Sequence, residues 1–181
     1  MADGDIRPAT PDDVPEIVRM IRELAEYEKG LDQCDATEEL LMSVLFGGEV
    51  DGVAPASHHG RAAAWTHVVE HRDATCDPPR TLAGFALWFL NTSTWTSRHG
   101  IYLEDLYVRP EFRGTGYGQR LLATLAALCV EHGYARLDWW VLDWNTPAID
   151  FYLSQSAVAM DEWTVFRITG DALPRLAARA T

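Results

Sequence analysis

One short segment constrains the fold of this chain more than any other, the glycine-rich turn at residues 113–118. An apolar β-type run at residues 100–109 precedes the turn, and leucines at helical spacing follow it at residues 117–132. Glycines let a main chain approach an anion closely, and the first N–H groups of a helix have no partner within that helix. A strand, a glycine turn and a helix in this order therefore predict a backbone site for phosphate.

Two better-known phosphate motifs do not fit the spacing of this turn. A dinucleotide-binding fingerprint that starts at Gly114 needs a glycine where the chain has Gln119. A Walker loop needs Gly-Lys where the chain has Gln119 and Arg120. The turn therefore represents another class of phosphate site.

Hydrophobic periodicity along the chain predicts one α+β domain over residues 1–181, with a mixed, mostly antiparallel sheet flanked by helices. Helices are predicted at residues 11–30, 37–47, 117–132, 146–153 and 171–179. Strands are predicted at residues 6–9, 62–71, 81–91, 100–109, 136–144 and 164–169. Residues 49–60 are expected to form a loop, and residues 73–80 a hairpin connection.

Charge and cysteine content exclude several classes of protein. The chain has 15 basic and 27 acidic residues, a net charge of −12, which is the wrong sign for a nucleic-acid partner. Three cysteines without a C-x-x-C pair encode neither a disulfide framework nor a zinc ribbon. The sequence contains neither a signal-peptide pattern nor an apolar run long enough to span a membrane. We therefore predict a cytoplasmic protein with no membrane partner.

The turn and its surroundings resemble the GCN5-related N-acetyltransferases, or GNAT superfamily. Residues 113–118 match its Arg/Gln-x-x-Gly-x-Gly/Ala signature, whose amides hold the pyrophosphate of acetyl-CoA. Four further segments resemble the diamine (spermidine/spermine) and thialysine acetyltransferase branch: residues 6–10, 24–28, 102–108 and 144–152. The resemblance spans nearly the whole chain and is weakest between Gly47 and Pro79. It implies a GNAT fold and the transfer of acetyl from acetyl-CoA to a primary amine of a small cationic molecule, such as a diamine, a polyamine or a lysine- or thialysine-like compound.

Acetyl transfer needs a neutral amine and a proton for the departing thiolate. An alkyl amine with a pKa near 10.4 arrives charged at neutral pH, so a nearby group must accept its proton. Glu104 and Asp105 are the acidic residues of the central strand, and the resemblance implies a bulge that places both near the amine. We expect Glu104 to accept the proton through water, with Asp105 as its neighbour. Tyr152 matches the general acid of the family, although a packed aromatic residue also fits that position.

The resemblance assigns further residues to the two ligands. The backbone of residues 106–108 is expected to pair with the pantetheine arm and to donate an N–H to the thioester oxygen. The expected coenzyme contacts are Leu106, Tyr107, Val108, Arg113, Gly114, Thr115, Gly116, Tyr117, Gly118, Gln119, Asn145, Ala148 and Tyr152. The expected substrate contacts are Tyr27, Glu28, Glu104, Asp105, Glu162 and Trp163.

A second ammonium group of the substrate would suit these contacts, because a carboxylate pairs with a cation and tryptophan offers its ring face. Glu28 and Glu162 are equally explained as ordinary surface residues. Two departures from the polyamine branch stand out. Residues 92–96 lack an aspartate, which argues against long polyamines, and residues 151–157 lack a basic pair and a glycine, which leaves the path of the following chain open.

Several alternatives remain at this level. The acceptor can instead be a peptide or protein amine, or the chain can be a catalytically silent sensor that binds acyl-CoA. No metal is predicted, because the histidines form no cluster with cysteine or acidic residues. Trp139 and Trp140 are adjacent and should face opposite sides of their strand, so one of them is expected to cover an exposed face. This feature predicts a homodimer, which the family also forms.

Overall fold

The computed structural model describes residues 4–48, 60–72 and 80–180 of the chain. The loops predicted at residues 49–60 and 73–80 lie almost entirely outside these residues. The chain divides into two compact units, Met1–Trp140 and Val141–Thr181, which are described separately. The prediction of a single domain remains a prediction.

The first unit contains a five-stranded sheet whose strands follow chain order: β1 (Gly4–Pro8), β2 (Trp65–Arg72), β3 (Arg80–Ser93), β4 (Arg98–Val108) and β5 (Leu137–Asp138). The strands from β1 to β4 pair antiparallel, whereas β5 runs parallel to β4. The parallel pairing follows a crossover through helix α3 (Tyr117–His132). The predicted mixed, mostly antiparallel sheet is therefore confirmed.

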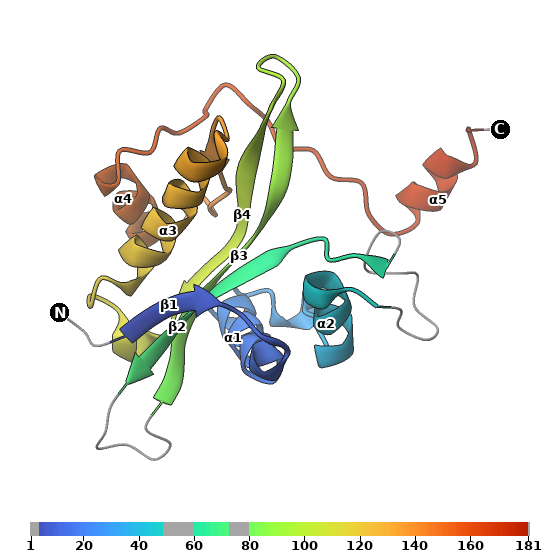
Figure 1. Cartoon of the computed structure of the whole chain (residues 1–181). Coiled ribbons are helices and arrows are strands. Elements are labelled where there is room, and N and C mark those ends of the chain that lie inside the picture. The colour runs from blue at the N-terminus through green and yellow to red at the C-terminus, as the bar shows by residue number, and fades with distance from the viewer. Residues whose placement is uncertain (1–3, 49–59, 73–79, 181) are drawn as a thin grey trace. The chain divides into compact units, whose positions relative to one another are not determined.

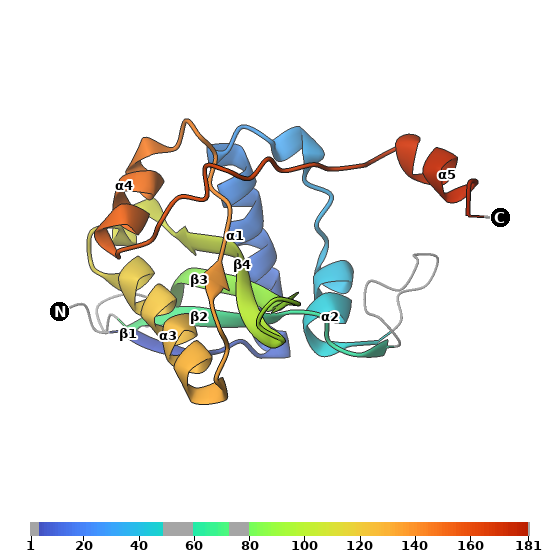
Figure 2. The ribbon, with the colours of Figure 1, turned by 90° about the horizontal axis from the view of Figure 1, so that it is seen from above.

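Helices cover both faces of this sheet (Figures 1 and 2). Helices α1 (Val14–Tyr27) and α2 (Glu38–Phe46) pack on one face, where their apolar residues form a buried core with Val68, Phe85 and Tyr107. Helix α3 covers the other face with Leu121, Leu122 and Leu125. Burial of these apolar surfaces is the main favourable contribution to folding.

Capping interactions stand at the starts of the first two helices. Before α1, Thr10 and Asp13 form a capping box, in which the Thr10 N–H donates to Asp13 Oδ2 at 2.7 Å. Thr37 caps α2 by accepting from the N–H of Leu40. Helix α3 begins at Tyr117 and ends at His132, as predicted.

A bulge interrupts β4 at Glu104. Leu103 pairs with Trp88 of β3 and Asp105 pairs with Leu87, so Glu104 is an extra residue between the two pairs. Because Leu87 and Trp88 are adjacent, they point to opposite faces of the sheet. Leu103 and Asp105 therefore also lie on opposite faces, which an unbroken strand would not allow. The bulge expected from the family resemblance is present.

The strand predicted at residues 136–144 is much shorter than expected. Only Leu137 and Asp138 belong to β5, and they pair with Ile101 and Tyr102. The pairing ends just before the bulge, which bends β4 and disrupts its ladder. Trp139 and Trp140 consequently follow the strand instead of lying within it.

The second unit contains helices α4 (Thr146–Ser154) and α5 (Ala172–Ala177). The strand predicted at residues 164–169 is wrong, because these residues pair with no strand. Trp163, Val165 and Phe166 are exposed, and Phe166 is 88% exposed. A β-type sequence forms a strand only where a neighbouring strand supplies hydrogen bonds and packing contacts. Composition alone was therefore insufficient to predict a strand here.

Candidate active site

The loop at residues 113–116 joins the end of the strand region to α3 and has the geometry of an anion site. Gly114 and Gly116 have φ angles of +77° and +90°, which favour glycine. An added Cβ atom at either position would meet no atom within 4 Å, so the space beside the loop is open. Gly116 is the N-cap of α3 and makes no side-chain cap. Backbone amides and the positive end of the helix therefore face a space that suits a diphosphate.

The first turn of α3 supplies further N–H groups to this anion site. We call the loop and this first turn, residues 113–119, the glycine cradle. The helical ladder starts where the N–H of Arg120 donates to the carbonyl of Gly116 at 3.0 Å, which leaves the N–H groups of Gly118 and Gln119 ahead of it. Thr115 Oγ1 donates to the carbonyl of Phe112 at 2.6 Å and stabilises the loop internally. The side chain of Tyr117 is buried, so only the backbone of Tyr117 is available for the predicted coenzyme contact.

Arg113 links the loop to two predicted site residues. Its Nε donates to the carbonyl of Val108 at 2.9 Å. Its guanidinium lies over the ring of Tyr27, 5.0 Å from the centroid, and 5.8 Å from the centroid of Tyr107. The end of α1, the end of β4 and the loop therefore meet at this arginine.

The outer edge of β4 is available for backbone pairing. From Leu103 to Val108 this strand pairs with β3 on one edge, while β5 reaches only Ile101 and Tyr102 on the other. Among the residues that the structure describes, no strand covers the rest of that edge. This is the stretch, residues 106–108, for which we predict pairing with pantetheine.

Three carboxylates gather where α1 ends and β4 bulges. Burial, together with the negative charges of Glu104 and Glu28, raises the pKa of Asp105 to about 7. Burial also raises the pKa of Glu28. Glu104 itself is exposed. The structure thus brings together three of the predicted substrate residues in a group that can attract a cation and hold or release a proton near neutral pH.

A network of charged groups that the sequence analysis did not identify holds α1 against β4. Arg109 donates from Nε and Nη2 to the carboxylate of Glu23 at 3.0 and 2.8 Å, and its Nη1 pairs with Glu16 at 2.7 Å. Glu16 and Glu23 are seven residues apart and lie on the same side of α1. The seven-residue spacing of the two glutamates can be read from the sequence, but only the fold identifies Arg109 as their partner.

Tyr107 belongs to the same network. Burial, together with the charge of Glu23 and its hydrogen bond with the hydroxyl group, raises the pKa of Tyr107 to about 12. The phenol therefore stays protonated and serves to position β4. Any contact of Tyr107 with a coenzyme is left to its backbone, as the sequence analysis expected for residues 106–108.

In the second unit, α4 presents three predicted coenzyme residues on one side. Asn145 is buried and its side chain caps the helix by accepting from the N–H of Ala148. Ala148 and Tyr152 follow Asn145 at positions i+3 and i+7, so all three lie on one face. Glu162 and Trp163 are exposed in the segment that follows α4.

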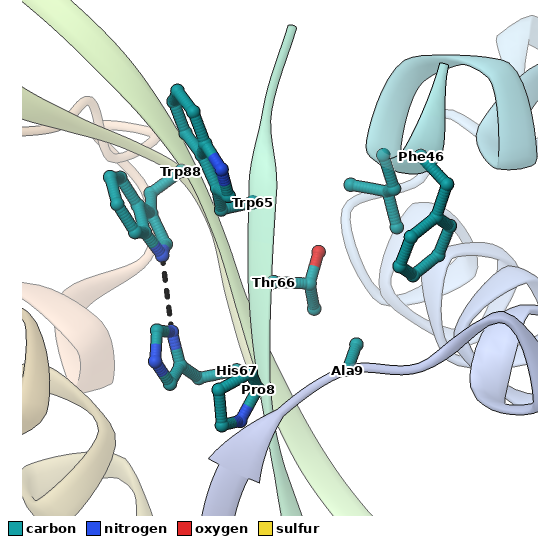
Figure 3. Close-up of a pocket in the computed structure, with 8 residues that line it drawn as sticks. Pro8, Ala9, Phe46, Trp65, Thr66, His67 and Trp88 are labelled. Carbon is teal, nitrogen blue, oxygen red and sulfur yellow. Dashed lines mark hydrogen bonds between the residues drawn. The ribbon is translucent and has the colours of Figure 1, made fainter. Parts of the chain in front are cut away.

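A separate apolar pocket of about 160 Å³ lies where β1 ends near α2 (Figure 3). Trp65 and Trp88 stack beside it with ring centroids 5.0 Å apart, and the Nε1 of Trp88 donates to Nδ1 of His67 at 3.2 Å. Burial lowers the pKa of His67, which favours a neutral ring. The pocket contains none of the predicted site residues and no carboxylate.

The described part of the chain provides no group of three or more histidine, cysteine or acidic residues arranged to hold a metal ion. Among the helices of these same residues, none is both long and apolar enough to cross a membrane. The predictions concerning metal and membrane partners stay predictions.

The sheet, the glycine cradle and the open edge of β4 together define a protein of the acetyltransferase class. The sequence matches the acetyltransferase (GNAT) family over residues 22–156. The chain therefore belongs to this family and is an acetyltransferase, an enzyme class that uses acetyl-CoA as cosubstrate. The predicted GNAT fold and enzyme class are confirmed.

Relatives agree with this assignment over the whole chain. The thialysine N-epsilon-acetyltransferase of Sus scrofa is 38% identical over 183 residues, covering 99% of this chain and 100% of that protein. The L-ornithine N5-acetyltransferase of Arabidopsis thaliana is 33% identical, covering 93% of this chain and 85% of that protein. A solved structure with a similar fold, an integron cassette protein from V. cholerae, has a TM-score of 0.72, 24% identity and 98% coverage of both chains.

Proposed function

We propose that this enzyme transfers an acetyl group from acetyl-CoA to a primary amine of a small cationic molecule, and that lysine-like amino acids are its favoured acceptors, with diamines next. The single observation that carries the cationic acceptor class is the group of three carboxylates, Glu28, Glu104 and Asp105, at the end of α1 and the bulge of β4. The preference for amino acids over diamines rests on the names of the relatives. The names of the thialysine and ornithine acetyltransferase relatives support the same acceptor class.

The chain's own residues have distinct roles toward the coenzyme. Bound acetyl-CoA would supply the acetyl thioester. The amides of residues 114–119 would hold its diphosphate, because the glycine loop and the start of α3 present N–H groups to open space. The free edge of β4 at residues 106–108 would orient the pantetheine arm and donate an N–H to the thioester oxygen. Arg113, held over Tyr27 and Tyr107, adds positive charge beside this path.

The acidic residues would prepare the amine. We assign proton acceptance to Glu104, the exposed extra residue of the bulge, with water as a relay. Asp105 and Glu28 would attract the cationic substrate and keep its reacting nitrogen near Glu104. Asp105 must be ionised for this purpose, and its pKa of about 7 makes the required ionisation sensitive to pH near neutrality.

On α4, Tyr152 would donate a proton to the departing thiolate, and Asn145 and Ala148 on the same helix face would contact the coenzyme. Glu162 and Trp163 would bind the far end of the substrate. We further propose a homodimer, for which Trp140 is a candidate interface residue because it is 58% exposed after β5. The expected cytoplasmic location and the absence of a nucleic-acid partner stay predictions.

A thiol-release assay with acetyl-CoA tests this proposal. The acceptor panel contains thialysine, lysine, ornithine, putrescine, spermidine and a lysine-containing peptide. We expect the highest kcat/KM with the amino acids and the lowest with spermidine and the peptide. Silence with every acceptor, combined with tight binding of CoA, would instead identify an acyl-CoA sensor, and preference for the peptide would move the substrate class to protein amines.

The replacement Tyr152→Phe tests the proposed general acid. We expect kcat to fall by about 10²–10⁴ while CoA still binds, because only the proton donor is lost. Tyr134→Phe is a matched control, since Tyr134 lies after α3 in the first unit, where its ring packs against His132. Equal kcat values for the two variants would remove Tyr152 from the mechanism.

A further inference from the structure

One imidazole contacts the residues on both sides of the glycine loop at 113–116. His71 lies in β2, opposite Gly4 of β1. Its Nδ1 is 2.7 Å from the hydroxyl oxygen of Tyr117, the first residue of α3, and the tautomer decides which group donates. The ring of His71 also lies 4.7 Å from the ring of Phe112, the residue before the loop. Both ends of the loop are therefore anchored on β2.

The Tyr117 side of this anchor is tightly packed. Tyr117 is 1% exposed, and a Cβ atom placed on Gly4 would lie 2.6 Å from its hydroxyl oxygen, so the phenol packs directly on the backbone of β1. One turn along α3, Arg120 donates from Nη2 to the carbonyl of Gly4 at 2.7 Å. Its guanidinium also lies 5.8 Å from the Tyr117 ring centroid. The start of α3 is thus attached to β1 and β2.

This anchoring has a functional consequence for a loop built around glycine. Gly114 and Gly116 allow the required backbone angles, but the same freedom lets the loop adopt many other conformations. An anion held by backbone amides binds best when those amides are already oriented, because ordering them on binding costs free energy. A contact that holds Phe112 and Tyr117 reduces that cost without touching the ligand.

We propose that His71 is a positioning residue for the coenzyme: it holds Phe112 and Tyr117 in place and thereby orients the amides of residues 114–119. The proposal rests on the proposed coenzyme site at this loop. It differs from the roles assigned above because His71 and the Tyr117 side chain lie on the protein side of the loop. They affect the diphosphate only through the backbone.

Titration calorimetry with CoA, together with steady-state kinetics, tests this role in the full chain. Tyr117→Phe removes only the hydroxyl group and should raise the Kd for CoA and the KM for acetyl-CoA by about 3- to 10-fold, as expected for one lost hydrogen bond. The kcat and the KM for the amine should stay close to wild type. His71→Leu should have at least the same effect, and His71→Asn, which keeps a polar group near the position of Nδ1, should recover part of the affinity.

His67→Leu is the matched control. It removes another histidine of β2 that also has a side-chain hydrogen bond, the one from Trp88, but that lies opposite Pro8 at the far end of β1. It should lower the melting temperature by an amount similar to His71→Leu while leaving the Kd for CoA unchanged. Equal weakening of CoA binding by both leucine variants would attribute the effect to general destabilisation and overturn the proposal.

The remaining outcomes separate the two proposals. If Tyr117→Phe and His71→Leu bind CoA as tightly as the wild type, the role of His71 is overturned. The proposed coenzyme site is then unaffected. Failure of the wild-type protein to bind CoA would overturn both. If His71→Leu does not fold, Tyr117→Phe, which keeps the buried ring, decides the question alone.

Discussion

The glycine loop and the carboxylate group are built by different means. At the loop, the groups that we propose bind the coenzyme are backbone amides, and glycine is needed only for its conformation and its lack of a side chain. At the carboxylate group, three acidic side chains come from two elements, and burial and mutual repulsion determine the pKa of Asp105. The difference indicates that coenzyme binding should tolerate many side-chain changes, whereas handling of the amine should depend on individual carboxylates.

Replacing the proposed proton acceptor should have the largest effect. Glu104→Gln should lower kcat by about 10²–10⁴, because a neutral amide cannot accept the proton of the amine. The Kd for CoA should not change, since the cradle is made of backbone. Rapid-mixing assays and calorimetry measure the two quantities, with Glu131→Gln at the exposed end of α3 as the control. A variant that loses CoA binding instead of turnover would show that the two regions are not separate.

A side chain introduced into the glycine loop should have the next largest effect. It should change the KM for acetyl-CoA instead of kcat. Gly116→Val should raise the KM for acetyl-CoA about 100-fold, because the side chain enters the space for the diphosphate and strains a left-handed residue. Gly133→Val is the matched control: Gly133 ends α3 with a φ of +68° and is equally open. Both variants should lose similar stability, but only Gly116→Val should lose affinity. Equal KM values would assign the glycines to turn geometry alone.

The pH dependence of kcat/KM for the amine should show a smaller effect, which arises from the carboxylate group. Because the pKa of Asp105 is about 7, kcat/KM for the amine should fall about tenfold per pH unit below that value. Asp105→Asn should be slower and should lack this limb of the profile. An unchanged limb in the variant would assign the titration to another group.

The same substitution should change stability in the opposite direction. The pKa of Asp105 is raised in the folded state, so its ionisation destabilises the fold progressively as pH rises from about 4 to 7, and fully above that range. At pH 8, Asp105→Asn should therefore be more stable than wild type, on the order of 2–4 kcal/mol, with little difference at pH 4. Urea unfolding at the two pH values measures the change. Equal stability at pH 8 would mean that the Asp105 carboxylate is well solvated in the folded protein.

Local sequence was sufficient to predict the elements with strong local signals. Helix α3 begins and ends at the predicted residues, because a glycine stands at each end and leucines recur on one side. Residues 136–144 and 164–169 carry equally clear β-type composition, yet only Leu137 and Asp138 form a strand. A strand depends on a neighbour, and in these segments that dependence decided the outcome.

The sequence by itself determined the glycine loop that we propose holds the coenzyme, since the order of strand, glycine loop and helix is a local property and the proposed binding groups belong to the backbone. Only the tertiary structure decided which side chains meet there. The bulge at Glu104 places Asp105 toward α1 and Glu28, Arg109 joins two glutamates from a distant helix, and His71 reaches both ends of the loop. These contacts join residues far apart in the chain, and their energies depend on burial and distance, which a one-dimensional pattern does not contain.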